Sequence, residues 1–232
     1  MQAAPQRRRM LRDPKPRPEI TSTSTSERIL DAAEFLFADR GFAGAGMRDI
    51  ANSVGLNPAS LYNHFESKQA LYERVLERGL RPIFELLDAL RDSDWSPESL
   101  DHETNTLLAR LARRPHMARL IVHETLAGGE NLQRIARDWL RPLYSRALAT
   151  FQENPTTRDW EKDELPLLLM SFHHLLLGYF AAAPMLREVM HEDPLSAEAM
   201  ERQSRFMRKI VRLLVLDARS GATRDDAARA EE

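Results

Sequence analysis

The sequence has no cysteine among its 232 residues, which excludes disulfide bonds and thiolate metal sites. It also has no excess of positive charge, because 33 Lys and Arg residues face 35 Asp and Glu residues and leave a formal net charge of −2. Composition alone therefore gives no indication of a polyanionic partner. The opening stretch, MQAAPQRRRML, is charged and has no apolar core long enough for a secretion signal, so we expect a cytoplasmic protein.

Motifs that carry catalysis are missing as well. The sequence contains no glycine-rich phosphate loop, no nucleophile elbow and no pair of histidines at metal-binding spacing. Glu188 and His191 have the spacing of a carboxylate-bridged metal helix, but such sites need a second copy and two further glutamates, and no second copy is present. We therefore expect no enzyme activity, no metal and no cofactor.

Helical spacing of apolar residues dominates the chain, without strand-like alternation and without an internal repeat. The sequence predicts an all-α fold in which a small three-helix head precedes a larger helical domain. At this length the chain can hold one large or two modest domains with a substantial core.

The stretch from Met47 to Lys68 has the pattern of a helix-turn-helix. Gly55 follows Ala51 by four residues, so a left-handed glycine can end the first short helix while a small alanine lets the two helices cross closely. Asn57 can cap the second helix, and Pro58 suits its first position because the missing N–H costs nothing there. The alternative is a plain surface hairpin of helices, since Ala-x-x-x-Gly is common by chance.

A second helix with this N-terminus has the right form to enter a DNA major groove. Its outer face would present small and polar residues that allow close approach: Asn57, Ala59, Ser60 and Asn63. Upstream, Ser24 and Glu27 fit a capping box, and an amphipathic helix follows until Gly41. Downstream, Ser67 can cap a helix whose first turn contains Lys68, and a cation beside free N–H groups suggests a bound phosphate.

Three stretches of this region resemble the amino-terminal DNA-binding domain of the TetR family of bacterial transcription regulators. They are ILDAAEFLFADRGF (29–42), MRDIANSVGLNPASLYNHF (47–65) and SKQALY (67–72). The resemblance implies phosphate contacts by Tyr62, His64 and Lys68, and a contact of Arg48 with the backbone or a base edge. Family members commonly carry a Thr or Ser before the helix that starts near Met47, whereas this sequence has Ala45 and Gly46. One phosphate contact on each side is therefore expected to be missing or replaced by a backbone N–H.

The expected organisation has four parts: a disordered basic arm (1–25), the helix-turn-helix domain (26–72), a helical effector-binding and dimerisation domain (73–220) and a disordered tail (221–232). The arm carries six basic residues against two acidic ones and is rich in Pro, Ser and Thr. It is either a solvated tail or a basic arm that follows the DNA backbone or minor groove and adds salt-sensitive affinity.

One long helix, predicted from Ser67 to Leu90, is the only covalent element common to both domains. Gly79 and Pro82 lie in its interior, where each costs roughly 1 to 3 kcal/mol relative to alanine. Either packing merely tolerates a bend there, or the bend transmits effector binding to the head. In the second case, replacing both residues with alanine would stiffen the helix and leave the fold intact.

The larger domain contains a run from Leu165 to Leu186 that is apolar nearly all round. Its length approaches that of a membrane span, but His173, His174, Gly178 and Pro184 within it, and the lack of a second span, favour a buried helix. Because such a helix covers more than its own core, we predict a homodimer through helices at 165–186 and 196–218, and no membrane partner. In the TetR family the last two helices do form a four-helix bundle with those of the second copy.

A small-molecule pocket needs apolar walls and a few polar groups, and the larger domain offers both. The candidate pocket residues are Phe84, His123, Trp139, Tyr144, Phe172 and His173. His173 and His174 point about 100° apart on a helix, so at most one of them can face a given cavity. The alternatives are a core histidine bonded to a neighbouring carbonyl and aromatic residues that belong only to the core.

These observations predict a homodimeric, sequence-specific regulator of transcription on double-stranded DNA at the nucleoid. It would be a repressor, released from a palindromic operator when a small-molecule effector favours a head spacing that no longer matches major grooves roughly 34–36 Å apart. The alternative is an effector-free adaptor whose C-terminal domain recruits a protein partner. A cavity lined by the aromatic residues favours the regulator, and a solid core with an exposed apolar patch favours the adaptor.

Overall fold

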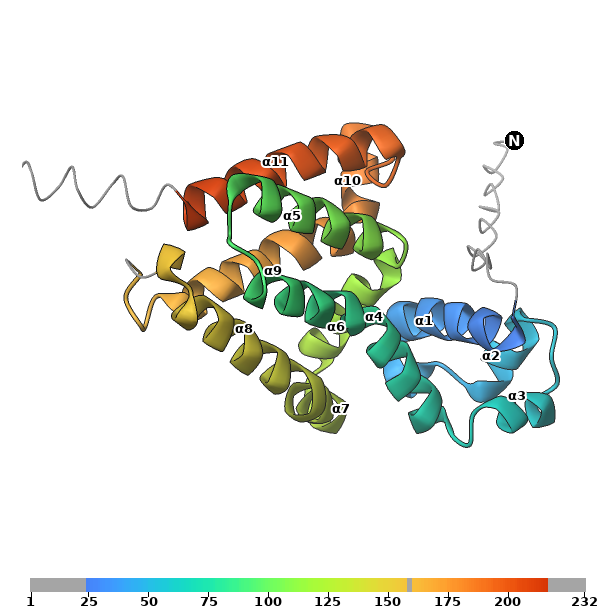
Figure 1. Cartoon of the computed structure of the whole chain (residues 1–232). Coiled ribbons are helices and arrows are strands. Elements are labelled where there is room, and N and C mark those ends of the chain that lie inside the picture. The colour runs from blue at the N-terminus through green and yellow to red at the C-terminus, as the bar shows by residue number, and fades with distance from the viewer. Residues whose placement is uncertain (1–23, 158–159, 217–232) are drawn as a thin grey trace, which may run out of the picture.

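The computed structural model describes residues 24–157 and 160–216, and every regular element within these ranges is a helix. In chain order the elements are α1 (Thr25–Gly44), α2 (Met47–Ser53), α3 (Pro58–His64), α4 (Lys68–Arg91), α5 (Pro97–Ala112), α6 (Pro115–Ala127), α7 (Gly129–Ile135), η1 (Ala136–Leu140), α8 (Arg141–Glu153), η2 (Pro155–Thr157), α9 (Leu165–Ala181), α10 (Ala183–Met190) and α11 (Ala197–Val215). The all-α prediction is confirmed. In Figure 1, α1, α2 and α3 form a head at one end, and α4 runs from this head into a larger helical body. The predicted C-terminal tail and all but the last two residues of the predicted arm lie outside the described residues.

The head forms around a dry centre contributed by all three of its helices. Its fully buried side chains include Ile29, Phe37, Ile50 and Leu61. Gly55 adopts a φ of +75° after α2, as the turn required. Asn57 then accepts a hydrogen bond from the Ser60 N–H at 2.7 Å, which fixes the start of α3. The predicted helix-turn-helix geometry is therefore present.

The first helix differs from its prediction at both ends. The Ser24 hydroxyl accepts from the Glu27 N–H at 3.2 Å, but the Glu27 carboxylate binds Arg78 in α4 instead of completing a capping box. Gly41 has a φ of +69° and kinks the helix, which continues to Gly44. A Cβ atom at Gly41 would lie 2.5 Å from the His123 ring, so both the backbone angle and the approach of α6 require glycine.

The long helix α4 packs closely against α6 at its interior glycine. A Cβ atom at Gly79 would lie 2.1 Å from Cε and 2.7 Å from Cγ of Met117. An alanine at position 79 would therefore require the Met117 side chain to shift, so the double alanine replacement in α4 is expected to cost packing as well as stiffen the helix. Pro82 lies one turn further on and is half-buried. The boundary predicted at 72/73 falls inside α4, which belongs to both parts.

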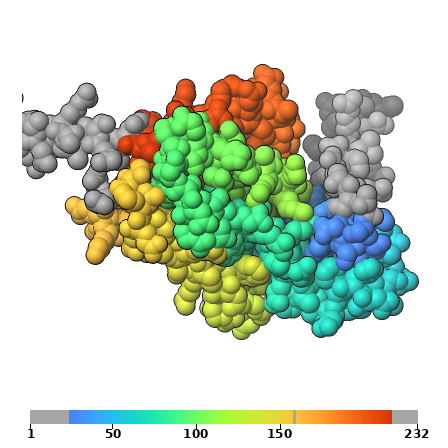
Figure 2. All heavy atoms as spheres, viewed as in Figure 1, coloured from blue at the N-terminus to red at the C-terminus, as the bar shows by residue number. Residues whose placement is uncertain are grey.

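The body contains two apolar clusters. The first continues from the head through α6 to Leu177, Phe180 and Met207. The second lies at the far end of α4 and is centred on Trp95, whose Nε1–H donates to the Leu90 carbonyl at 2.7 Å and whose ring meets Phe151 edge to face. In the space-filling view the head, blue to cyan, lies directly against the green and yellow-green atoms of the body (Figure 2).

Two predicted helices are interrupted. The helical stretch from α7 to α8, which the apolar spacing of residues 131–152 suggests as one helix, contains the π-helical segment η1, which ends two residues before Pro142, whose missing N–H cannot continue the α-helical bonding. The run from Leu165 to Leu186 is not one helix, because α9 ends at Ala181 and α10 leaves it at 63° with Pro184 in its first turn. Within the described residues no single helix meets the length and hydropathy needed to cross a membrane, and α9 with α10 meets them only as a bent pair.

Candidate functional site

The outer face of α3 carries most of the residues predicted to read DNA. Asn57, Ala59, Tyr62, Asn63 and His64 are exposed there, and Ser60 is half-buried. The Tyr62 ring is 51% exposed, although a large aromatic side chain normally avoids water. The side-chain oxygen of Asn57, Oδ1, already accepts a hydrogen bond from the Ser60 N–H. The side-chain NH₂ group of Asn57 therefore remains for a further contact. The structure thus brings six of the eight predicted residues onto one short helix and its cap.

Lys68 begins α4 beside this face, but its side chain turns back onto the end of α1. Its Nζ donates to the Ala43 carbonyl at 3.4 Å and lies 4.5 Å from the centre of the Phe42 ring. Burial lowers the pKa of Lys68, and the charge of Glu124 opposes this shift. The ammonium group therefore has protein partners of its own and has to leave them, or share them, to hold a phosphate.

The start of α2 lacks a Thr or Ser cap, as the sequence indicated. Gly46 is its N-cap and provides no side-chain hydrogen bond. Arg48 is exposed in the first turn, while the neighbouring Asp49 carboxylate binds Arg40 at 3.0 Å. The first N–H groups of α2 are thus left without a side-chain cap.

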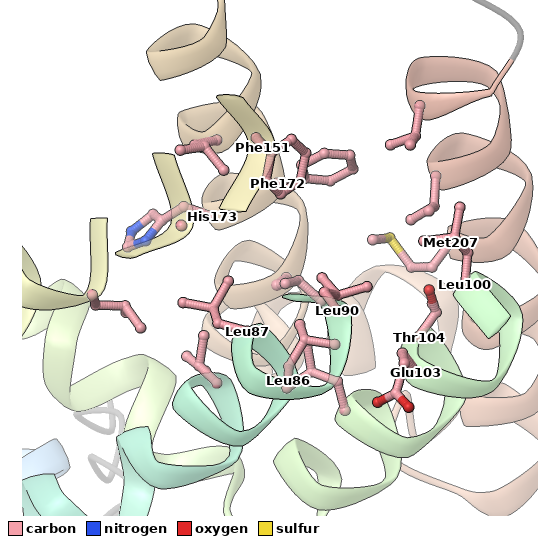
Figure 3. A pocket seen from close by; sticks show the side chains of 18 of the residues that line it. Leu86, Leu87, Leu90, Leu100, Glu103, Thr104, Phe151, Phe172, His173 and Met207 are labelled. Carbon is pink, nitrogen blue, oxygen red and sulfur yellow. The ribbon is translucent and has the colours of Figure 1, made fainter. Parts of the chain in front are cut away.

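A cavity of about 150 Å³ lies in the body, bounded by α4, α5, α8, α9 and α11. Tyr144, Phe172 and His173 of the predicted pocket line it. Its other walls are almost wholly apolar, and Figure 3 shows His173 across the cavity from Glu103 and Thr104, with Leu87 and Leu90 between them. A concave apolar space with a few polar groups is the usual form of a small-molecule site.

The other predicted pocket residues lie elsewhere. His123 packs against Gly41 between α1 and α6. Trp139 borders a separate, more polar hollow between α4 and the α7–η1 segment, and Phe84 packs on the outside of the second apolar cluster. These three aromatic residues occur at core spacing in the sequence, which does not distinguish one wall of a helix bundle from another.

The adjacent histidines are separated as the helical geometry required. His173 faces the cavity beside Tyr144, with the ring centres 5.9 Å apart, and burial together with the neighbouring His174 lowers its pKa. His174 is exposed, and its Nδ1 lies 2.7 Å from the Met170 carbonyl. A neutral imidazole therefore faces the cavity at neutral pH.

Two polar contacts between head and body were not predicted. The buried Glu124 carboxylate in α6 accepts from the Phe42 backbone N–H at 2.8 Å and from Asn131 at 2.6 Å. Arg78 in α4 binds three carboxylates of α1 at 2.9 Å each: Glu27, Asp31 and Glu34. Helical periodicity places such residues on a face but does not identify partners 44 to 82 positions away.

Sequence analysis also missed Glu103, which lines the cavity from α5. A signal was present, because Glu103 lies three residues after Leu100 and four before Leu107 and so belongs to the apolar stripe of its helix. The part of the chain that the structure describes contains no group of three or more His, Asp or Glu side chains arranged to hold a metal ion.

Comparison with known proteins identifies relatives of the head. The family model described as "Bacterial regulatory proteins, tetR family" matches residues 29–75. The HTH-type transcriptional regulator UidR of Escherichia coli (strain K12) is 30% identical over 128 residues, which cover 49% of this chain and 65% of that protein. The HTH-type transcriptional repressor KstR2 of Mycolicibacterium smegmatis is 34% identical over 110 residues, which cover 46% of this chain and 53% of that protein. The chain thus spans about half to two thirds of the length of these relatives.

Solved structures share the fold across both parts. A Clostridium perfringens protein described as a fatty acid metabolism regulator has 19% identity and a TM-score of 0.60, with 80% of this chain and 96% of that chain covered. A transcriptional regulator from Aquifex aeolicus VF5 has 19% identity and a TM-score of 0.55, with 82% and 99% covered. At these identities the likeness concerns the fold alone.

Proposed function

Since this chain is a member of the TetR family of bacterial regulatory proteins, we propose that it is a sequence-specific DNA-binding regulator of transcription and acts as a repressor. The observation that carries this proposal is the exposed face of α3, which presents Asn63 and Tyr62 outward on a helix with a fixed, capped N-terminus. Such a helix enters a major groove with its first turns against the base edges. The protein would act on the chromosome in the cytoplasm.

The division of contacts on this face follows from chemistry. Asn63 has an amide that can pair with the edge of an adenine, so we assign it to base reading. Tyr62, His64 and Lys68 lie at the end of α3 and the start of α4, and we assign them to phosphates, with Arg48 reaching the backbone or a base edge from α2. Small side chains at Ala59 and Ser60 allow the helix to approach the groove closely.

We further propose that two copies associate through α9 and α11, so that the two heads read a pseudo-palindromic operator. Apolar side chains that remain exposed on these helices support this assignment: Leu167, Met170, Phe206 and Leu213. Large apolar side chains that stay exposed in one copy are candidates for burial against a second copy. The cavity, walled by α9 and α11, would bind the effector and shift the spacing of the heads.

The adaptor alternative receives less support from the same features. An adaptor needs no apolar cavity in its body, whereas this body contains one of about 150 Å³. Four of its exposed apolar side chains lie on the helices that a dimer would use, and the others lie on α6 and α10. We therefore retain the effector-controlled repressor as the single proposal.

DNA selected from a random-sequence pool by the full-length protein tests the proposal. We expect a pseudo-palindromic sequence, and removal of either half-site should weaken binding sharply at ordinary salt, measured by fluorescence anisotropy. Full affinity of monomeric protein for a single half-site, or recovery of no preferred sequence, would contradict it.

Single substitutions distinguish the residues assigned to phosphates from the residue assigned to a base. Tyr62→Phe and Lys68→Ala should weaken all sequences similarly and lower the salt slope by about one, because phosphate contacts carry no sequence information. Asn63→Ala should relax the preference at one position of each half-site, at a cost of roughly 1 to 3 kcal/mol. Gln133→Ala, which removes an exposed amide from α7, is the control and should change neither quantity. A changed sequence preference for Lys68→Ala, with nonspecific affinity intact, would show that Lys68 is assigned wrongly.

A further inference from the structure

The cavity wall has an unusual distribution of charge. Glu103 is the only acidic residue among those that line it, and none of the lining residues is Lys or Arg. The remaining polar groups are neutral: Thr104 beside Glu103, and Tyr144 with His173 on the opposite side. A ligand in this space therefore meets one negative charge and no positive one.

The Glu103 carboxylate is free of protein cations. Within the described residues it makes no ion pair or side-chain hydrogen bond, although arginines surround its helix. Arg208 and Arg212 bind Asp101 at 3.4 and 2.8 Å, and Arg110 binds Glu85. Because each of these three arginines has another carboxylate partner, none of them pairs with Glu103 at the cavity wall.

The position of Glu103 allows a ligand in the cavity to pair with its carboxylate. The residue is half-buried, so its carboxylate stays in partial contact with water while it lines the cavity. A carboxylate at such a rim avoids the large cost of full burial and can still pair with a charge on an incoming molecule. Leu100 and Leu107 flank it on the same helix face, so the apolar space begins directly beside it.

We propose that the cavity binds a small lipophilic cation, with its ammonium group at Glu103 and its apolar body between the two sides of the cavity. This inference rests on the proposed effector function and names the chemical class of the effector. A carboxylate ligand would find no cation and would be repelled by Glu103, whereas a neutral ligand would leave the carboxylate partly desolvated without compensation. An ammonium group satisfies it with a charge-assisted hydrogen bond.

The size and lining of the cavity restrict the apolar body. An apolar cavity of about 150 Å³ admits a molecule about the size of benzene. Phe151 and Phe172 lie together on one wall, where a ligand ring can contact them edge to face. The fitting molecule is therefore an aromatic or compact aliphatic amine with a short chain.

A matched series of three probes tests the ligand class: phenethylamine, phenethyl alcohol and phenylpropionate, which are cationic, neutral and anionic at neutral pH. Calorimetric titration of the full-length protein without DNA should give an affinity for the amine about tenfold above that for the alcohol, with the acid weakest. Glu103→Gln, which keeps the shape and removes the charge, should reduce the amine to the affinity of the alcohol. Glu98→Gln removes the same charge from an exposed position of α5 and should leave the preference unchanged.

A second variant tests the location. Ala147 lines the cavity from α8, and Ala147→Leu fills part of the space, so it should weaken the amine and the alcohol alike in a protein whose melting temperature is maintained. Tightest binding of the acid, an unchanged amine affinity in Glu103→Gln, or no binding of any probe would overturn the proposal. Operator release is measured separately: an amine that binds as stated but releases no DNA would contradict the effector function alone, and release by the acid alone would contradict the ligand class alone.

Discussion

At the scale of single residues, Arg78 is the centre of a partly buried group of charges between α4 and α1. Its guanidinium group binds Glu27, Asp31 and Glu34 of α1, and Arg114 stands 3.5 Å from Glu34 on the other side. The side chains of Arg78 and Glu34 are 12% and 4% exposed, so this pair is largely removed from water. Burial raises the pKa of Glu34, and the two arginines oppose that rise. The removal of one partner therefore strands a buried charge, which typically costs 3 to 5 kcal/mol.

We predict that Arg78→Met lowers the free energy of unfolding by about 3 kcal/mol at pH 8 and by less at pH 5. A carboxyl group whose pKa is raised by folding takes up a proton more readily in the folded state, so its contribution to stability is present at low pH and is lost as the pH rises through the folded pKa. Without Arg78 this rise is larger, and protonation of Glu34 relieves the penalty in acid. Urea unfolding at both pH values measures the difference. As a control, Arg81→Met breaks an exposed pair with Glu77 and should cost under about 1 kcal/mol at either pH. If Arg78→Met lost the same free energy of unfolding at both pH values, the charge of Glu34 would not be the source of the loss.

A second prediction at this scale concerns the missing cap of α2. The backbone at Gly46 has a φ of −94° and a ψ of 146°, and an added Cβ atom would meet only the Asp49 carboxyl group, at 3.5 Å or more. Gly46→Ser can therefore cap the helix and should raise the free energy of unfolding by a few tenths of a kcal/mol, whereas Gly46→Ala has the same Cβ atom without the oxygen and should fall about 1 kcal/mol below the serine variant. Thermal unfolding of both variants decides it, and an alanine variant as stable as the serine variant would exclude capping as the cause.

At the scale of elements, the sequence predicted the features that depend on neighbouring residues and missed those that depend on tertiary packing. The cap at Asn57, the turn at Gly55 and the start of α4 at Ser67 each depend on residues within one helical turn, and the sequence predicted all three. The break between α9 and α10 was missed because hydropathy continues across it although the backbone turns by 63°. Pro184 was visible there, but a proline in the first turn of a helix and one inside a kinked helix look alike in sequence.

The same limit applies to the candidate site. The exposed face of α3 that we propose to read DNA could be predicted as a face because its residues are close together in sequence and their helix is short. The cavity draws its walls from five separate helices, and only the three-dimensional packing shows that Tyr144, Phe172 and His173 share it while His123 and Trp139 do not. Which apolar face meets which neighbour is a tertiary property, and periodicity alone does not contain it.

The packing of α4 on α6 yields the prediction at this scale. Alanine has a higher helix propensity than glycine by about 1 kcal/mol, so Gly79→Ala would stabilise a free helix. Here the new methyl group would collide with Met117, and we expect a net destabilisation of about 1 to 3 kcal/mol. In the double variant with Met117→Ala the loss should be smaller than the sum of the two single losses, because the collision is gone. Urea unfolding of the wild type, the two single variants and the double variant gives the free energies for this double-mutant cycle. Strictly additive losses would show that positions 79 and 117 do not interact.

At the scale of the whole molecule, the head is attached to the body at two places. One is the continuous helix α4, and the other is α6, where Glu124 holds the Phe42 N–H and His123 fills the kink at Gly41. A shift of α6 relative to α4 therefore reaches the end of α1 directly, without passing along α4 through Pro82. This second attachment supports a mechanism in which packing changes in the body reorient the reading heads.

The last prediction concerns the two-copy assembly on which palindromic reading depends. Leu167 on α9 and Leu213 on α11 are 67% and 56% exposed, and in a dimer through these helices both would be buried. Glutamate at each position would put charges into that contact, so Leu167→Glu with Leu213→Glu should convert dimers into folded monomers. These monomers should no longer bind two half-sites together but should keep weak nonspecific binding to DNA. Light scattering coupled to gel filtration gives the mass, and circular dichroism confirms the fold. Leu126 is 84% exposed at the end of α6, outside the proposed interface, and Leu126→Glu is the matched control that should stay dimeric. If the double variant remained a dimer with intact operator binding, the two copies would have to meet through another face of the body.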